Sequence, residues 1–144
     1  MKYLVYLLLF SFSLQATTIH VGKKYAIKSV KKGLALAKIG DTVIVHGGHY
    51  REGNISIDKK IVFLGKDLPV LDGEKKHEVL SIHADSVVVD GFKIIKSSYA
   101  TITDPCGIKV YNKSYVIIQN NVLDDNFFGI YLQNCQKCTI KNNY

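Results

Sequence analysis

The sequence predicts an all-β protein, a single-stranded right-handed parallel β-helix with a short N-terminal capping helix. The first observation behind this prediction is an internal repeat. Residues 107–122 and 129–144 share six identical residues when they are aligned with an offset of 22. A fixed period of about twenty residues, built from short apolar runs and Asn or Gly turns, is typical of a solenoid in which each period forms one coil.

The second observation is the alternation of apolar residues within each period. Ile108 and Val110, like Val116 and Ile118, alternate with polar or exposed neighbours. A period of two is that of a strand with one buried face. We therefore expect these side chains to point inward and to stack on their counterparts one coil away.

The third observation is the position of the asparagines between the apolar runs. Asn112 aligns with Asn134, and Asn120 aligns with Asn142. Asparagine tolerates left-handed backbone angles and hydrogen-bonds the local main chain, so it allows a strand to turn sharply. The sequence thus predicts ladders of stacked asparagines at the corners of the coils.

The N-terminus is interpreted as a secretory signal peptide. Lys2 precedes an apolar run at residues 3–14, and small and polar residues follow. That order fits a charged region, a hydrophobic region and a cleavage point. The alternative, a membrane anchor, would need about 20 apolar residues, and this run has 12. We expect residues 1–16 to be the signal, 17–41 an N-terminal cap and 42–144 the β-helix, in a periplasmic protein with no membrane insertion after cleavage.

The net charge of +7 comes almost entirely from lysine, because Arg51 is the single arginine. Scattered lysines are typical of a solvated surface, and they also protect exposed strand edges from aggregation. A nucleic-acid interface would instead show clustered basic residues interleaved with aromatic ones. The charge pattern therefore predicts no nucleic-acid partner.

Residues 26–38 are predicted to form the capping helix, ended by Gly40. One face of this helix would carry Ile27, Val30, Leu34 and Ala37, and the other face would carry lysines. A basic amphipathic helix can also bind membranes, but a solenoid needs a cap over its first coil and this segment lies in the right place.

Before the two clear coils, short strands are predicted at 18–21, 55–57, 61–64, 79–82 and 87–89. Another strand is predicted to begin at Thr42, with Val43 and Val45 pointing inward. Gly47 and Gly48 would break the strand that begins at Thr42. Alignment of Val45, Phe63, Val89, Ile118 and Ile140 gives spacings of 18, 26, 29 and 22. The spacing of 29 implies seven extra residues in a loop at about 97–106. Loops that extend from solenoid coils are frequent sites of function.

Several segments resemble the NosD-type periplasmic proteins. They are the run Leu-Asp-Asp-Asn-Phe-Phe-Gly-Ile-Tyr-Leu at 123–132, Gly-Asp-Thr at 40–42, Tyr-Arg-Glu-Gly at 50–53 and Val-Leu-Asp-Gly at 70–73. The resemblance implies a right-handed β-helix that works with ABC transporter subunits in assembling the copper centre of nitrous oxide reductase, without catalysis of its own. Members of that family are much longer. We therefore expect the β-helix to be truncated at Tyr144.

Copper is the cofactor that this resemblance implies, and Cu(I) favours thiolate, thioether and imidazole ligands. The only methionine, Met1, would leave with the signal. The candidate ligands are therefore Cys106, Cys135 and Cys138, together with the pair His46 and His49. Cys135 and Cys138 form a Cys-x-x-Cys motif, which is also compatible with a disulfide or with packed cysteines. The two histidines flank a Gly-Gly turn and are also typical of an exposed loop.

A rival hypothesis is an enzyme that acts on acidic polysaccharide, as the β-helix pectate lyases do. Its candidate carboxylates are Asp104, Asp124 and Asp125. Adjacent strand residues point to opposite faces, so Asp124 and Asp125 can share a groove only if they lie in a turn.

A third hypothesis is a passive sugar-binding module. Outward-facing aromatic side chains would provide its stacking surfaces, and the candidates are Tyr111, Tyr115 and Tyr131.

Overall fold

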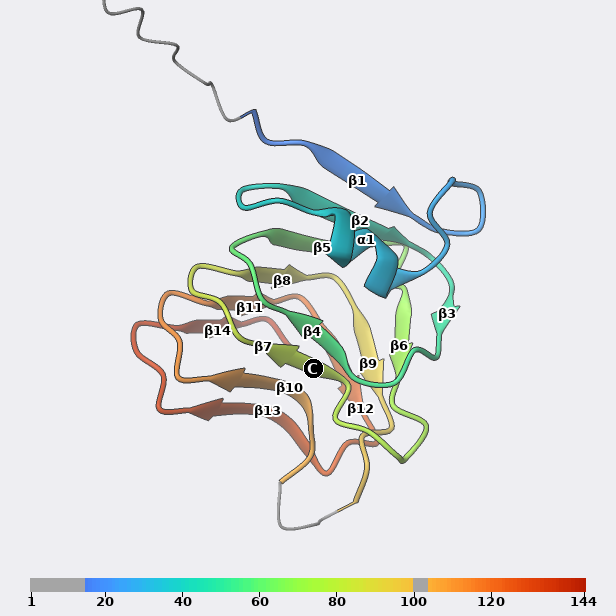
Figure 1. The fold of residues 1–144 in the computed structure, drawn as a ribbon. Coiled ribbons are helices and arrows are strands. Elements are labelled where there is room, and N and C mark those ends of the chain that lie inside the picture. Colours follow the sequence, from blue (N-terminus) through green and yellow to red (C-terminus); the bar gives the residue numbers. More distant parts are fainter. Residues whose placement is uncertain (1–14, 100–103) are drawn as a thin grey trace, which may run out of the picture.

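The computed structural model describes residues 15–99 and 104–144, and it confirms the predicted parallel β-helix (Figure 1). Three sheets run along the solenoid, and every pairing between neighbouring strands is parallel. Sheet A contains β1 (Thr18–Val21), β2 (Thr42–His46), β5 (Val62–Lys66), β8 (Val88–Asp90), β11 (Ile117–Gln119) and β14 (Thr139–Lys141). Sheet B contains β3 (His49–Tyr50), β6 (Val70–Asp72), β9 (Lys93–Ile95) and β12 (Val122–Asp124). Sheet C contains β4 (Ile55–Ile57), β7 (Leu80–Ile82), β10 (Cys106–Tyr111) and β13 (Phe128–Gln133).

The core is a column of aliphatic and aromatic side chains enclosed by the three sheets. In sheet A the stacked inward positions are Val43, Phe63, Val89, Ile118 and Ile140. The prediction that Val45 stacks on Phe63 is wrong, because Val45 pairs with Gly65 and the spacing in the first coil is 20 rather than 18. Val43 and Val45 are both fully buried, so the alternation alone leaves a register ambiguity of two residues.

The asparagine ladders are confirmed. Asn112 and Asn134 have φ of 52° and 49°, and the Asn134 amide donates to Asn112 Oδ1 at 3.2 Å. Asn120 and Asn142 repeat this arrangement at the next corner, with φ of 56° and 53°. A further ladder of Asn121 and Asn143 lies inside the coil, where the Asn121 amide donates to Asn143 Oδ1 at 3.0 Å.

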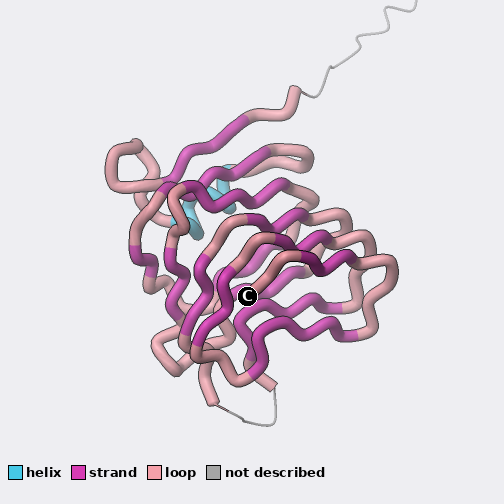
Figure 2. Tube along the Cα trace, turned by 180° about the vertical axis from the view of Figure 1, so that it is seen from behind, coloured by secondary structure: helices cyan, strands magenta, loops and turns pink. Residues whose placement is uncertain are grey.

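The capping helix is shorter than predicted. Helix α1 spans Val30–Leu36 and not residues 26–38. Ile27 instead forms a parallel bridge with Val21, and Ser29 adopts an extended conformation as the N-cap, with its hydroxyl accepting from Lys32 N. The helix lies at the N-terminal end of the solenoid and contacts β1, β2 and β4 (Figure 2). A Cβ on Gly33 would lie 2.5 Å from Val21 Cγ2, so this position allows the helix to approach β1 closely.

The strand at 55–57 has the predicted bounds, and those at 61–64, 79–82 and 87–89 shift by one or two residues. Ten residues separate β9 from β10, against three between β12 and β13, which confirms the predicted insertion of seven. Residues 100–103 of this loop lie outside the described residues, as does the predicted signal at 1–16 apart from Gln15 and Ala16. Among the residues described, no helix is long and apolar enough to cross a bilayer.

Candidate functional site: the outer face of sheet C

Polar and aromatic side chains gather on the outer face of sheet C. Inward positions of β7 and β10 hold buried Leu80, Ile82, Ile108 and Val110. The strands β7, β10 and β13 pair in register, so Ser81, Lys109 and Tyr131 form one row. Successive residues of a strand point to opposite sides, and this row therefore lies outside the core. We call the group of Glu78, Ser81, Lys109, Tyr111, Phe128 and Tyr131 the sheet C face.

Hydroxyl groups surround the carboxylate of Glu78. The Tyr111 hydroxyl lies 3.0 Å from each oxygen of Glu78 and donates to that carboxylate. The Ser81 hydroxyl also donates to Glu78, and the amide of Asn54 donates to Ser81 Oγ at 2.7 Å. This network connects three coils and holds the side chains of the face in fixed positions, because Asn54 and Tyr111 each donate to a side chain of the coil between them.

Lys109 joins this network to the aromatic rings. Its Nζ lies 4.9 Å from the centroid of the Tyr111 ring and 5.1 Å from that of Tyr131. The lysine is only 6% exposed, whereas Tyr131 is 37% and Phe128 is 43% exposed. The rings of Phe128 and Tyr131 lie 6.1 Å apart and are nearly parallel, with an interplanar angle of 23°. The face therefore presents aromatic surface to solvent next to a buried cation.

Burial changes the acidity of two groups at this face. Burial, together with the Glu78 carboxylate, raises the pKa of the Tyr111 hydroxyl above its ordinary value, so it remains a hydrogen-bond donor. Burial and Glu78 likewise raise the pKa of the Cys106 thiol to about 12. The Cys106 thiol donates to the Asp104 carbonyl at 3.0 Å, and it is protonated at neutral pH.

The three cysteines are all free thiols. Burial raises the pKa of Cys106, so this thiol is protonated at neutral pH. Cys135 and Cys138 pack against the core in the last coil, and burial, together with the neighbouring Cys135 thiol, raises the pKa of Cys138. Across the described parts of the chain, no three His, Cys, Asp or Glu side chains are grouped to hold a metal ion. The structure therefore brings Cys135 and Cys138 of the Cys-x-x-Cys motif into contact, whereas Cys106 lies at the start of β10.

His46 and His49 do not form a pair. His46 Nε2 lies 3.0 Å from His20 Nδ1, and its ring stacks on Tyr25 with centroids 4.2 Å apart. His49 Nε2 instead contacts Asp72 Oδ2 at 2.7 Å. The chain passes from β2 of sheet A to β3 of sheet B at the Gly-Gly turn between them, so the two imidazoles belong to different clusters.

The carboxylates predicted for acid-base chemistry are ion-paired or exposed. Asp125 has φ of 56° and therefore lies in a turn, which is the arrangement that it would need to share a groove with Asp124. Its carboxylate pairs with Lys75, and Asp124 pairs with Lys93 at 3.6 Å. Asp104 is exposed, next to residues 100–103. Asp124 therefore ends strand β12 and Asp125 lies in the turn that follows, and the two carboxylates are held by separate lysines.

Two of the three predicted tyrosines lie on the sheet C face. They are Tyr111 and Tyr131, whereas Tyr115 lies before β11, where its hydroxyl accepts from Lys137 Nζ at 3.0 Å. Sequence reasoning missed Glu78, Ser81 and Lys109 as site residues. The alignment of Lys109 with Tyr131 at an offset of 22 was a usable signal for that position, but nothing in the irregular second coil marks Glu78.

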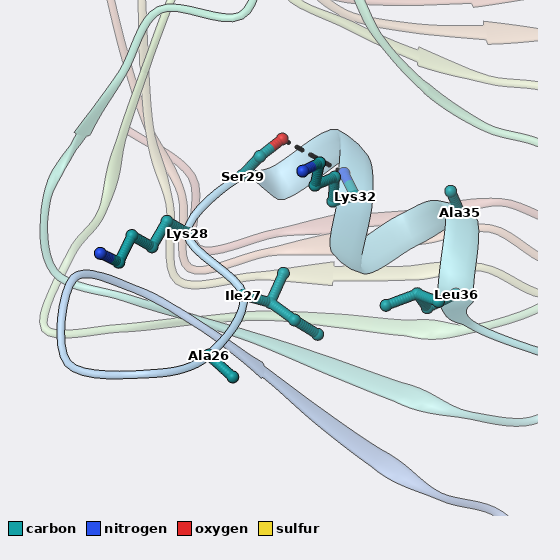
Figure 3. A pocket seen from close by; sticks show the side chains of 7 residues that line it. All are labelled: Ala26, Ile27, Lys28, Ser29, Lys32, Ala35 and Leu36. Atoms are coloured by element: carbon teal, nitrogen blue, oxygen red, sulfur yellow. Dashed lines mark hydrogen bonds between the residues drawn. The ribbon is translucent and has the colours of Figure 1, made fainter.

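A cavity lies at the capping helix rather than at this face. It has a volume of about 630 Å³ and is lined by residues 26–29, Lys32, Ala35 and Leu36 (Figure 3). Its walls are mostly apolar, and the two lysines are its only ionisable groups. This lining holds no carboxylate or imidazole, and the hydroxyl of its one serine, Ser29, donates to Glu52.

Comparison with known proteins places the fold in a family. The family model described as "Right handed beta helix region" matches residues 73–144, which is half of the 144-residue chain. No curated protein and no solved structure matches. The match gives the β-helix family as a whole and not the narrower NosD type. The chain belongs to the right-handed β-helix family.

Proposed function

We propose that this protein is a secreted, non-catalytic carbohydrate-binding β-helix that holds a polysaccharide on the sheet C face. The observation that carries the proposal is the row in which Lys109 lies between the rings of Tyr111 and Tyr131, with exposed Phe128 beside it. Sugar rings stack their C–H faces on exposed aromatic rings, and their hydroxyls bind fixed charged groups. This face offers exposed rings for stacking, next to polar side chains that its own hydrogen bonds hold in fixed positions.

Binding without catalysis is favoured by the state of Glu78. Its carboxylate already accepts from the hydroxyls of Tyr111 and Ser81. A general base must reach the proton that it abstracts, and these two donors occupy the oxygens that would do so. Incubation with pectate or alginate should therefore give no unsaturated product. Steady turnover would replace the binding proposal with a lyase.

The direct test is binding to immobilised polysaccharides, including pectate, alginate and neutral glucans. Tyr131→Ala should weaken binding about five- to tenfold, because it removes one stacking ring. Tyr115→Ala is the matched control, since it removes an exposed tyrosine from a different part of the coil and should bind like the wild type. Equal binding by the wild type and Tyr131→Ala, or no binding to any polysaccharide, would overturn the proposal.

A role in nitrous oxide reductase maturation in the periplasm is a second proposal, supported by the NosD-type run at 123–132. In that role the protein would dock to the reductase or to ABC transporter subunits, and its described residues provide no group of three His, Cys, Asp or Glu ligands for copper. Neighbouring genes for a nitrous oxide reductase and an ABC transporter would support this role. The absence of these genes would contradict this role and leave carbohydrate binding as the one proposed function.

A further inference from the structure

A charged pocket lies where the strands of sheet B end, away from the sheet C face. It has a volume of about 330 Å³ and is lined by Arg51, Asp72, Glu74, Lys75 and Lys96. Strand β3 ends at Tyr50, β6 at Asp72 and β9 at Ile95, so each lining residue ends a sheet B strand or closely follows one. Because the strands are parallel, these ends meet at one edge of the sheet.

The buried carboxylate of this pocket is fully engaged. Asp72 is 3% exposed, and it accepts from Glu74 N at 2.8 Å, from His49 Nε2 at 2.7 Å and from Arg51 Nε at 3.5 Å. Burial alone would raise the pKa of Asp72, but these donors outweigh burial and hold the pKa below its ordinary value. Asp72 is therefore ionised at neutral pH, and it holds one edge of the Arg51 guanidinium.

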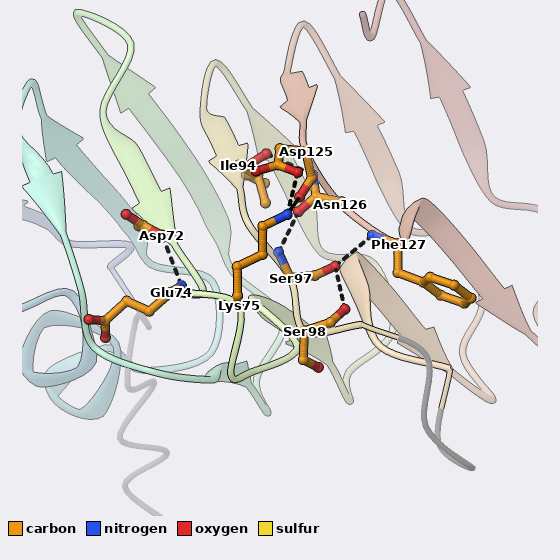
Figure 4. Close-up of polar contacts among 9 residues, drawn as sticks. All are labelled: Asp72, Glu74, Lys75, Ile94, Ser97, Ser98, Asp125, Asn126 and Phe127. Atoms are coloured by element: carbon orange, nitrogen blue, oxygen red, sulfur yellow. Dashed lines mark hydrogen bonds and ion pairs between the residues drawn. The ribbon is translucent and has the colours of Figure 1, made fainter.

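Lys75 is engaged as well. Its ammonium group pairs with the Asp125 carboxylate and donates to the Asp125 carbonyl at 2.9 Å (Figure 4). It also lies 4.7 Å from the Tyr99 ring centroid. The side chains of Glu74 and Lys75 diverge from adjacent positions in the turn (Figure 4). Lys75 thus forms a wall of the pocket.

Two cations of the pocket keep nitrogen donors that no described carboxylate engages. Arg51 contacts Asp72 only through Nε, and its side chain is 60% exposed. Within the part of the chain that is described, the Arg51 Nη nitrogens and Lys96 Nζ make no hydrogen bond or ion pair. A planar guanidinium with two unused donors is suited to bind an oxyanion in a bidentate manner, and a nearby ammonium adds charge.

We propose that Arg51 and Lys96 form a binding site for a single oxyanion group, either the carboxylate of a uronic acid or a sulfate or phosphate group. Arg51 donates from Nη1 and Nη2, and Lys96, which also lines the pocket, adds a second positive charge. Asp72 and His49 are positioning residues that orient the guanidinium. Glu74 lies at the rim and opposes binding by like-charge repulsion.

The test is a titration of isotope-labelled protein with sodium sulfate, sodium phosphate and sodium galacturonate at constant ionic strength, followed by NMR at the Arg51 Nε–H and the Lys75 amide. Galactose is the neutral control. We expect saturable shifts with at least one of the anions and none with galactose. Saturation by galacturonate alone assigns the site to a uronate, and saturation by sulfate or phosphate assigns it to a tetrahedral anion.

Matched variants separate this site from general attraction to a basic protein. Arg51→Met and Lys96→Met should each weaken binding about tenfold, whereas Glu74→Gln should strengthen it about twofold. Lys76→Met removes a lysine from the same turn that does not line the pocket, and it should bind like the wild type. Shifts that rise linearly without saturation, or equal affinities for Arg51→Met and Lys76→Met, would overturn the proposal.

This site stands independently of the sheet C face. Tyr131→Ala should leave the anion titration unchanged, and Arg51→Met should leave binding to neutral glucans unchanged. The failure of one proposal therefore does not imply the failure of the other.

Discussion

The two ends of the solenoid are stabilised by different chemistry. At the C-terminal end, identical amides stack at an offset of 22 residues, as in the pairs Asn112 and Asn134 or Asn121 and Asn143. At the N-terminal end, charged side chains bind backbone groups. Glu52 accepts from Val30 N at 2.7 Å, and Lys59 Nζ donates to the Ala37 carbonyl at 3.0 Å.

Regularity explains this difference. Coils with the same length place equivalent residues directly over one another, so one residue type repeated at one corner satisfies its neighbours in turn. The spacings of 20, 26 and 29 in the earlier part of the stacked column do not superpose whole coils. There, the backbone N–H groups at the start of α1 and the carbonyl groups at its end need partners. The Glu52 carboxylate accepts from the N–H groups, and the Lys59 ammonium group donates to the carbonyl groups.

The largest effect is expected for Asn121→Ala. Asn121 is fully buried, accepts from Phe92 N at 3.0 Å and donates to the Val89 carbonyl at 3.3 Å. Alanine would leave these groups buried without partners, which costs about 3 kcal/mol in the free energy of unfolding. Urea denaturation measures this loss. Asn120→Gly is the comparison variant, because Asn120 is exposed with φ of 56° and glycine accepts that conformation. Water can replace the hydrogen bonds of Asn120 to Asp90 and Asn142, so this variant should lose much less stability than Asn121→Ala.

At the other end, Glu52→Ala should cost about 2 kcal/mol. The Glu52 carboxylate accepts from Val30 N, from Lys31 N at 3.0 Å and from the Ser29 hydroxyl at 2.7 Å, so one side chain satisfies most of the first turn of α1. Glu52→Gln keeps one acceptor oxygen and should lose about half as much. If both variants unfold at the wild-type urea midpoint, the helix is held by its apolar face alone.

A fall in pH should destabilise the N-terminal end of the solenoid more than the C-terminal end. Asp41 accepts from Lys38 N at 2.7 Å and from Thr17 N at 2.8 Å, and these hydrogen bonds lower the pKa of Asp41. A lowered folded-state pKa gives stability that is present above the unfolded pKa of about 3.9 and is lost as the pH falls through the folded value. Asp41→Asn should therefore flatten the fall in stability between about pH 5 and pH 3. Asn120→Gly should keep the wild-type slope, because amides do not titrate.

The same contrast between regular and irregular coils decides which features the sequence predicted correctly. The repeat identified the fold, the Asn112 and Asn120 corners and the seven-residue insertion, because stacked coils copy one pattern. The Val45 register and the ends of α1 were wrong, because two buried valines in one strand and a bridge at Ile27 are settled by contacts with distant residues. Glu78 was missed for the same reason: its partners Tyr111 and Ser81 are fixed only when coils of unequal length stack.

The smallest effect is expected for Lys59→Met, which removes the ammonium group at the C-terminal end of α1 and keeps most of the side-chain length. Lys59 Nζ donates to the Leu34 carbonyl at 3.1 Å as well as to that of Ala37, and its side chain is 29% exposed. Water can replace part of this interaction, so the expected loss is about 1 kcal/mol. Lys60→Met, next to it and exposed, should change the urea midpoint little. If Lys59→Met loses as much stability as Glu52→Ala, both charged side chains hold the helix equally. If Lys59→Met loses no more stability than Lys60→Met, the first coil needs only the acidic partner.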